Sequence, residues 1–112
     1  MSIIIPHYEN LNYDEMAKKI GLKVAYMPML IESFLEESIP TLENLRESIT
    51  SRDYASIKSQ AHSIKGSAGN LRLDEIYEMA KEMELSATAH KIDFEYEDYR
   101  NAINQAILTI PA

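Results

Sequence analysis

The feature that most restricts the folds open to this chain is a repeated spacing of apolar residues at intervals of three and four. Such a spacing lines up side chains along one side of an α-helix. It recurs along most of the 112 residues, whereas no Asn-Gly or Asp-Gly pair marks a β-hairpin turn. With 46% hydrophobic residues the chain can bury a core, and its length suits one compact domain. The pattern therefore predicts a single all-α domain.

Five helices follow from this pattern and from the residues that begin and end them. They span roughly residues 13–20, 23–50, 53–70, 74–89 and 94–110. Gly21 ends the first helix, and Asp93 is expected as the N-cap of the last. Pro40 falls inside the second helix, where a proline should kink or interrupt the helix.

Each of the four long helices carries one apolar stripe, which we expect to be buried. The stripe of the second helix comprises Val24, Met27, Ile31, Phe34, Leu35, Ile39, Leu42, Leu45 and Ile49. The stripes of the next three comprise Tyr54, Ile57, Ala61, Ile64, Ala68 and Leu71; Leu73, Ile76, Ala80, Met83 and Ala87; and Tyr96, Tyr99, Ile103, Ala106 and Ile110. Short connections favour antiparallel neighbours. The expected architecture is an antiparallel four-helix up-and-down bundle with a short additional N-terminal helix, in which residues 1–11 form a tail and 12–112 the domain.

Charge and cysteine content exclude several classes of function. The formal net charge is −7, which argues against nucleic-acid partners and against anionic membranes. No cysteine occurs, so we expect a reducing compartment, the cytoplasm, and no thiolate metal site. The apolar run at the start stops at Pro6 and is too short for a secretion signal or a membrane span. Residues 51–72, by contrast, carry four basic residues and one acidic residue, which makes them a candidate anion site.

A histidine within this basic segment is predicted to face solvent. Successive helical residues are rotated by about 100°, so His62 lies roughly 120° from the centre of its helix's apolar stripe. Ala55, Lys58, Lys65, Gly66 and Gly69 fall around it on the same face. The surface beside the imidazole is thus made of small residues and lysines, with no acidic residue among them.

Two glycines on this face have a cost that calls for an explanation. Each destabilises a helix interior by roughly 1 kcal/mol relative to alanine. Gly69 and Asn70 could form a helix C-cap, and Gly66 could permit close helix packing. Gly66 is nevertheless predicted to face away from the core, where the missing Cβ would let the backbone of another protein approach the imidazole.

A carboxylate on the next helix is the candidate partner of the histidine. If the third and fourth helices form a hairpin that turns near residue 73, His62 and Glu84 lie opposite each other. A carboxylate that accepts from one ring nitrogen would fix the tautomer and leave the other nitrogen as a nucleophile.

Residues 61–87, AHSIKGSAGNLRLDEIYEMAKEMELSA, resemble the core motif of the histidine phosphotransfer (HPt) family of two-component phosphorelays. The resemblance extends over roughly residues 12–110, and the family fold agrees with the helices predicted above. It implies that His62 is phosphorylated on a ring nitrogen, Nε2, that Lys65 neutralises phosphoryl charge, and that Gly66 leaves room for the partner. Glu84 occupies the position where the family holds Gln or Glu against the imidazole. Gly69, Lys58 and Ala55 are expected to belong to the partner-binding surface.

The resemblance implies a phosphorelay intermediary without its own ATP-binding domain. His62 would accept a phosphoryl group from a receiver-domain aspartate, or from a kinase, and pass it to the aspartate of another response regulator. A hybrid sensor histidine kinase is the expected upstream partner, and the receiver is expected to supply Mg²⁺, so that no cofactor or metal site is expected in this chain.

Two alternatives remain open at this point. The chain could be the phosphotransfer fragment of a hybrid or chemotaxis histidine kinase, which would share the motif. It could also be a metal-binding helical bundle, although only three histidines occur and the Glu-x-x-His pairs typical of such bundles are missing. His90 is expected near the end of the fourth helix, where a cationic side chain suits the helix dipole.

Overall fold

The predicted helices all form in the computed structural model, which describes residues 3 and 5–111. They are α1 (Tyr13–Ile20), a 3₁₀ helix η1 (Val24–Tyr26), α2 (Met27–Thr50), α3 (Tyr54–Asn70), α4 (Asp74–Thr88) and α5 (Tyr96–Leu108). No strand occurs among the described residues. Residues 1, 2 and 4 of the predicted tail and residue 112 of the predicted domain lie outside them. The all-α prediction is confirmed.

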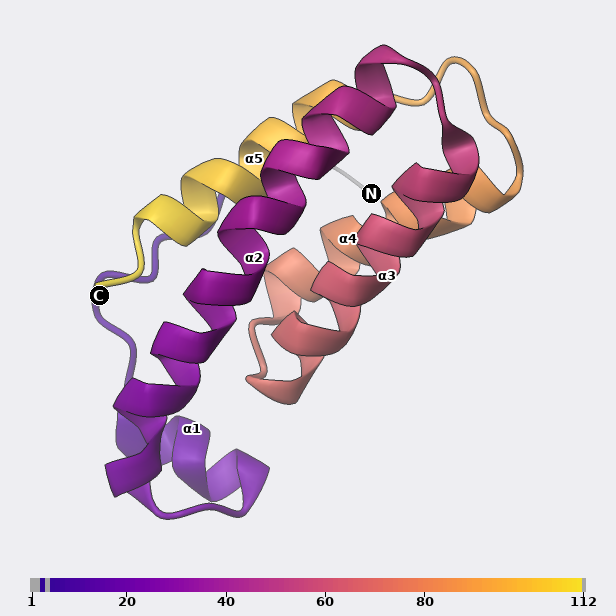
Figure 1. Ribbon diagram of the computed structural model, residues 1–112. Coiled ribbons are helices and arrows are strands. Elements are labelled where there is room, and N and C mark those ends of the chain that lie inside the picture. The colour runs from indigo at the N-terminus through magenta and orange to yellow at the C-terminus, as the bar shows by residue number, and fades with distance from the viewer. Residues whose placement is uncertain (1–2, 4, 112) are drawn as a thin grey trace.

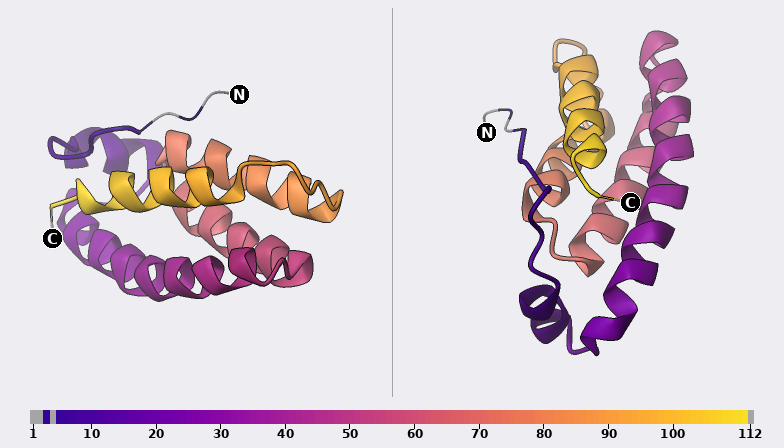
Figure 2. Two further views of the ribbon diagram at one scale, coloured as in Figure 1. Left: turned by 90° about the horizontal axis from the view of Figure 1, so that it is seen from above. Right: turned by 90° about the vertical axis from the view of Figure 1, so that its left-hand side faces the viewer.

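The four long helices form the predicted antiparallel bundle. α3 packs against α2 and α4, and α5 packs against α2 and α4, so that each helix has two neighbours (Figure 1). The short α1 contacts the beginning of α2 and lies at one end of the bundle (Figure 2). The antiparallel four-helix bundle with an additional N-terminal helix is therefore present, and the α3–α4 hairpin lies along one side of it.

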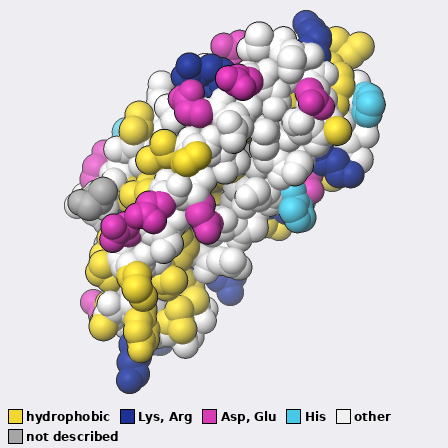
Figure 3. Space-filling model, viewed as in Figure 1, with side chains coloured by type: hydrophobic (Ala, Val, Ile, Leu, Met, Phe, Trp, Pro, Cys, Tyr) yellow, Lys and Arg dark blue, Asp and Glu magenta, His cyan; other side chains and the backbone are white. Residues whose placement is uncertain are grey.

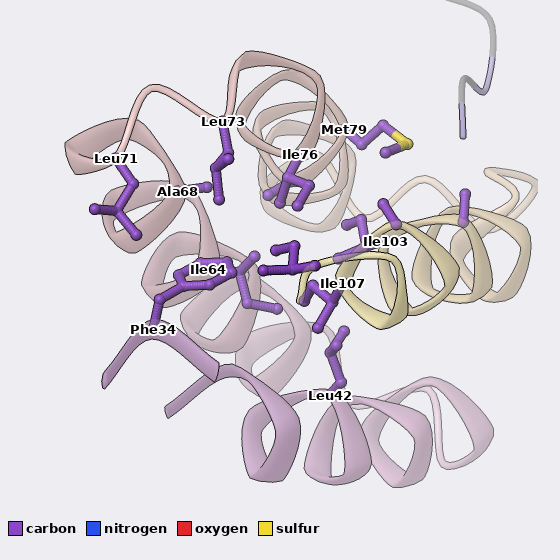
Figure 4. Packing of buried hydrophobic residues seen from close by; sticks show 14 of the residues in the cluster. Phe34, Leu42, Ile64, Ala68, Leu71, Leu73, Ile76, Met79, Ile103 and Ile107 are labelled. Atoms are coloured by element: carbon purple, nitrogen blue, oxygen red, sulfur yellow. The ribbon is translucent and has the colours of Figure 1, made fainter. Parts of the chain in front are cut away.

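The apolar stripes of the four helices meet in one core. The largest fully buried side chains are Met27, Ile31, Leu42, Leu45, Ile57, Ile64, Leu73, Ile76, Met79, Met83, Ile103 and Ile107. Figure 4 shows Leu42, Ile64, Ile76 and Ile103, one from each long helix, pointing into the same space. Burying an aliphatic side chain of this size stabilises a fold by about 1.5–3 kcal/mol, so this core holds α3 with its stripe inward and fixes which face it presents outward.

Three of the helices end in a left-handed residue that is not glycine. Arg52, Arg72 and His90 have φ angles of 56°, 60° and 51°. The amide that follows each of them donates to a carbonyl five residues earlier, as in Leu73 N to Ala68 O at 2.9 Å. This arrangement is the Schellman motif. The suggested C-cap at Gly69 and Asn70 is wrong, because both residues belong to α3 and the C-cap is Leu71.

The second helix differs from the prediction in three ways. Val24 belongs to η1 and is 44% exposed, and Ile39 is 50% exposed. The inward position that the stripe assigned to Ile39 is taken by Ser38, which is 2% exposed, because a period of 3.6 residues fits a line through Leu35, Ser38 and Leu42. Pro40 does not interrupt α2. It is exposed, so the carbonyl that its missing N–H leaves unbonded can face solvent.

The predicted cap of the last helix is also wrong. α5 begins at Tyr96 with Glu95 at the N-cap, and no side chain caps it. Asp93 lies two residues too early, because Phe94 turns inward and packs its ring against Tyr96 and Tyr99 at centroid distances of 4.8 and 4.6 Å. Ring packing rather than a side-chain cap therefore sets where this helix starts.

The segment before α1 contributes the buried Tyr8 to the core, and Ile3 and Leu11 pack against it. Tyr8 is 8% exposed; its hydroxyl donates to Glu75 at 2.8 Å, and its amide donates to Thr109 Oγ1 at 2.8 Å. Burial, together with the hydrogen bond to the Glu75 carboxylate, raises the pKa of the Tyr8 phenol. This part of the predicted tail is thus tied to both α4 and the end of α5.

Hydrophobic side chains are also exposed at the α1 end of the bundle. They include Leu22, Val24, Tyr26 and Met29, and Figure 3 shows hydrophobic side chains gathered over this end. Within the described part of the chain, no helix is both long enough and apolar enough to cross a membrane.

Candidate functional site

His62 stands on the outer face of α3, as its place on the helical wheel predicts. The stripe residues Ala61 and Ile64 on either side of it are 0% and 2% exposed, whereas the His62 side chain is 66% exposed. The core therefore positions the imidazole without covering it.

Glu84 on α4 holds the imidazole from one side. Its Oε2 lies 2.7 Å from His62 Nδ1, so the predicted contact between these two residues is present. The Glu84 side chain is only 14% exposed. It comes from the hairpin partner of α3 and follows the buried Met83, whose packing orients this turn of α4 toward the imidazole.

The same carboxylate binds a lysine with its other oxygen. Lys65 Nζ lies 2.6 Å from Glu84 Oε1. Burial favours the neutral form of Glu84, but the hydrogen bonds from Lys65 and His62 outweigh it and hold the pKa of the carboxyl below its ordinary value. The hydrogen bond to Glu84 in turn raises the pKa of Lys65. Glu84 is therefore a carboxylate bridge between a histidine and a lysine.

This bridge determines which ring nitrogen is available for chemistry. An ionised carboxylate only accepts hydrogen bonds, so Nδ1 of His62 must carry the proton that it donates to Glu84. In the neutral imidazole the lone pair then lies on Nε2. The site presents an exposed nucleophilic nitrogen with a fixed tautomer and an adjacent cation.

The two glycines of the His62 face have different surroundings. A Cβ on Gly66 would meet no atom within 4 Å, whereas one on Gly69 would lie 3.1 Å from Cδ2 of Tyr77. Gly66 is thus open to solvent beside the imidazole. Gly69 instead accommodates a ring of its own molecule, which the sequence interpretation missed, although hairpin pairing places Tyr77 opposite Gly69 as it places Glu84 opposite His62.

The remaining predicted residues, Ala55 and Lys58, lie on α3 before His62. Both are exposed, and both line a hollow that also contains His90. The Lys65–Glu84 ion pair was not anticipated, since Lys65 was assigned to the phosphoryl group alone. A lysine three residues after the histidine reaches the same part of the hairpin partner, and this spacing was the available signal.

A metal-binding bundle requires several ligating side chains gathered in one place. The described residues contain no group of three or more His, Cys, Asp or Glu side chains placed to hold a metal ion. His7 and His62 each face one glutamate, and His90 stacks on Tyr54 with ring centroids 5.3 Å apart.

Comparison with known proteins identifies the family. Searches of curated proteins and of solved structures found no match to this chain. A model of the Hpt domain matches residues 29–109, which span all four bundle helices except the first two residues of α2 and include His62, Lys65 and Glu84. Hpt domains are helical phosphotransfer modules of two-component relays, without kinase activity, and they interact with receiver domains. Since the match covers most of the chain, this protein belongs to the Hpt domain family.

Proposed function

We propose that His62 accepts a phosphoryl group on Nε2 from the aspartyl phosphate of a receiver domain and passes it to the aspartate of a second receiver. The observation that carries the proposal is the contact of 2.7 Å between Glu84 Oε2 and His62 Nδ1. It leaves Nε2 as the nucleophile on a side chain that is 66% exposed. A hybrid sensor histidine kinase is the expected source of the first phosphoryl group.

The transfer step can be written with its charges. The Nε2 lone pair attacks phosphorus, the bond from phosphorus to the aspartyl oxygen breaks, and the aspartate leaves as a carboxylate. The proton on Nδ1 stays in place, so the ring becomes positively charged as the N–P bond forms. The Glu84 carboxylate stabilises that charge where it develops, and this is the kind of preorganised electrostatic contribution that accelerates such steps.

Lys65 supplies the cation for the phosphoryl oxygens. In the unphosphorylated chain its ammonium is held by Glu84 at 2.6 Å. Once Nε2 carries a phosphoryl group, the ammonium has two anions within reach of one flexible side chain and can share its hydrogen bonds between them. Positioning and charge stabilisation account for most of the catalysis in phosphoryl transfer, and we expect the Mg²⁺ to come with the receiver.

The open surface at Gly66 is where the receiver backbone would approach. A Cβ there would meet nothing in this molecule, so internal packing does not require glycine. The same chemistry would apply if this chain were the phosphotransfer part of a longer histidine kinase, because the step involves only the α3–α4 hairpin and its partner.

A transfer experiment tests the proposal. Receiver domains from the source organism are phosphorylated with labelled phosphate, mixed one by one with the protein, and the label is followed over time. We expect rapid labelling by one or a few receivers and none in the His62→Gln variant. Label of equal extent on that variant, with its helical circular dichroism unchanged, would exclude His62 as the acceptor.

A further inference from the structure

A hollow of about 460 Å³ lies between the beginning of α3 and the end of α4. The side chains around it include those of Arg52, Tyr54, Ala55, Lys58, Thr88 and His90. Ala55 and the buried Ala87 are small, and the Tyr54 ring lies beneath the His90 ring at a centroid distance of 5.3 Å. The hollow is therefore lined by small and aromatic side chains together with polar and charged ones.

The lining of this hollow includes two cationic side chains, those of Arg52 and Lys58. Within the described part of the chain, the side chains of Arg52, Lys58 and His90 form no hydrogen bond and no ion pair. One carboxylate, Asp53, also lines the hollow. It accepts from the amide of Ser56 at 3.2 Å and from its hydroxyl at 2.8 Å, and these hydrogen bonds lower its pKa, so it keeps its negative charge. Lys65, by contrast, is bound to Glu84. The lining therefore carries two positive charges, on Arg52 and Lys58, against one negative charge, which is a local excess of positive charge on a chain whose net charge is −7.

Two of the lining residues occupy backbone positions that favour glycine. Arg52 and His90 have φ angles of 56° and 51°, in the left-handed region that costs other residues roughly 1 kcal/mol or more. Both positions end a helix, where Gly or Asn would serve the fold better. The side chains at both positions line the same hollow. The unfavourable backbone conformation at these two positions therefore places a guanidinium and an imidazole ring at one surface.

The hollow adjoins the phosphotransfer site. Lys58 precedes His62 by one helical turn on α3, and Thr88 follows Glu84 by one turn on α4. Hollow and imidazole therefore lie on the same face of one hairpin. A protein surface of about 800 Å² per partner, the usual size of a specific interface, would cover both when it docks on His62.

We propose that this hollow binds acidic side chains of the receiver domain while its aspartate engages His62, and so selects the receiver. The inference rests on the proposed function. Charge complementarity identifies the occupant, since the two cationic side chains of Arg52 and Lys58, neither of which forms an ion pair, favour a carboxylate-bearing surface over a neutral or basic one. Because these groups are exposed, their contribution should appear mainly in association and in its dependence on salt.

The test compares two phosphoryl donors on the double variant Arg52→Gln/Lys58→Gln. One donor is the phosphorylated receiver that transfers fastest to the unmodified chain. The other is phosphoramidate, a small molecule that needs no docking surface. The matched control is Lys18→Gln/Lys19→Gln, which removes two exposed charges from the other end of the bundle. Transfer is measured as a function of receiver concentration at low and at physiological salt.

The expected result is a KM for the receiver that rises about fivefold to tenfold at low salt, with kcat and the phosphoramidate rate unchanged, since an exposed charge pair is worth up to about 1 kcal/mol. The salt dependence of the receiver reaction should weaken, and the control should retain it. A KM and a salt dependence equal to those of the control would overturn the proposal. So would an equal loss with both donors, because it would show that the variant disturbs His62 itself.

Failure of the proposed function would look different. If neither donor labels His62 in the unmodified chain, the phosphotransfer role falls, and the docking inference falls with it. If phosphoramidate labels His62 and the KM for the receiver is unchanged in the Arg52→Gln/Lys58→Gln variant, only the docking inference is wrong.

Discussion

The surfaces at Gly66 and Gly69 lie one helical turn apart on α3 and show two different reasons for a glycine. At Gly69 the missing Cβ leaves room for the Tyr77 ring of the same molecule, whereas at Gly66 nothing lies within 4 Å of where a Cβ would stand. Internal packing explains the first glycine and leaves the second unexplained. A glycine that destabilises its helix therefore indicates a binding partner only where packing within the same molecule does not require that glycine.

The largest effect should come from filling the open surface. We expect Gly66→Leu to slow transfer from a phosphorylated receiver by about 100-fold or more, because an added side chain there collides only with the partner. Phosphoramidate labelling of His62 should stay within about twofold to threefold of the unmodified rate. Gln105→Leu, which adds a leucine at an exposed position of α5, is the control. Equal loss with both donors would contradict a steric role.

Removing the cation next to Gly66, the ammonium of Lys65, should have the next largest effect. Lys65→Ala is expected to slow receiver transfer by about tenfold, since it removes one charge that stabilises the phosphoryl oxygens. The fold should persist, because Lys65 lies outside the core. Stopped-flow or quenched-flow transfer kinetics, with circular dichroism as the check on folding, would measure this. An unchanged rate would remove Lys65 from the mechanism.

The stabilities of two alanine variants test whether the surroundings of Gly66 and Gly69 differ in this way. Gly66→Ala should stabilise the protein by about 0.5–1 kcal/mol, because alanine favours the helix and the new methyl group meets no neighbour. Gly69→Ala should gain less or lose stability, since its methyl group would lie 3.1 Å from the Tyr77 ring. Urea unfolding of both variants measures the difference. Equal gains would show that the Tyr77 ring moves freely and that the two glycines are equivalent.

The smallest expected effect is the contribution of Glu84 to the pH dependence of the free energy of unfolding. The pKa of this carboxyl is lower in the folded chain than its ordinary value of 4.5, so folding favours the ionised form. Its contribution should be fully present above about pH 4.5 and be lost as the pH falls through the folded-state pKa. The stability difference between the unmodified protein and Glu84→Gln, at most about 1 kcal/mol, should shrink over that range. A difference that stays constant down to pH 3 would contradict the ion pair.

Much of the fold could be predicted because burial and helical period act together along each segment. The stripes of α3 and α4 are buried or partly buried as predicted, from Tyr54 to Ala87. One error came where another interaction outweighed that period, since Phe94 packs its ring inward and delays the start of α5. Another came from following hydrophobic residues rather than the period, which places Ser38 and not Ile39 inward.

The candidate site was predictable to the extent that it depends on the geometry of one hairpin. Pairing across the turn near residue 73 anticipated the contact between His62 and Glu84, which the structure shows at 2.7 Å. It could not show that Glu84 also binds Lys65, because side-chain length and torsion decide that contact. Nor could spacing along α3 separate Gly66 from Gly69, since the difference arises from a ring on α4.

The most direct test of the account is to determine which nitrogen carries the phosphoryl group. The ¹⁵N-labelled protein, phosphorylated by its receiver, would be examined by NMR for coupling between phosphorus and the imidazole nitrogens. The account predicts phosphorus on Nε2 of His62, with a proton retained on Nδ1 toward Glu84. Phosphorus on Nδ1 of His62, or on His7 or His90, would contradict it.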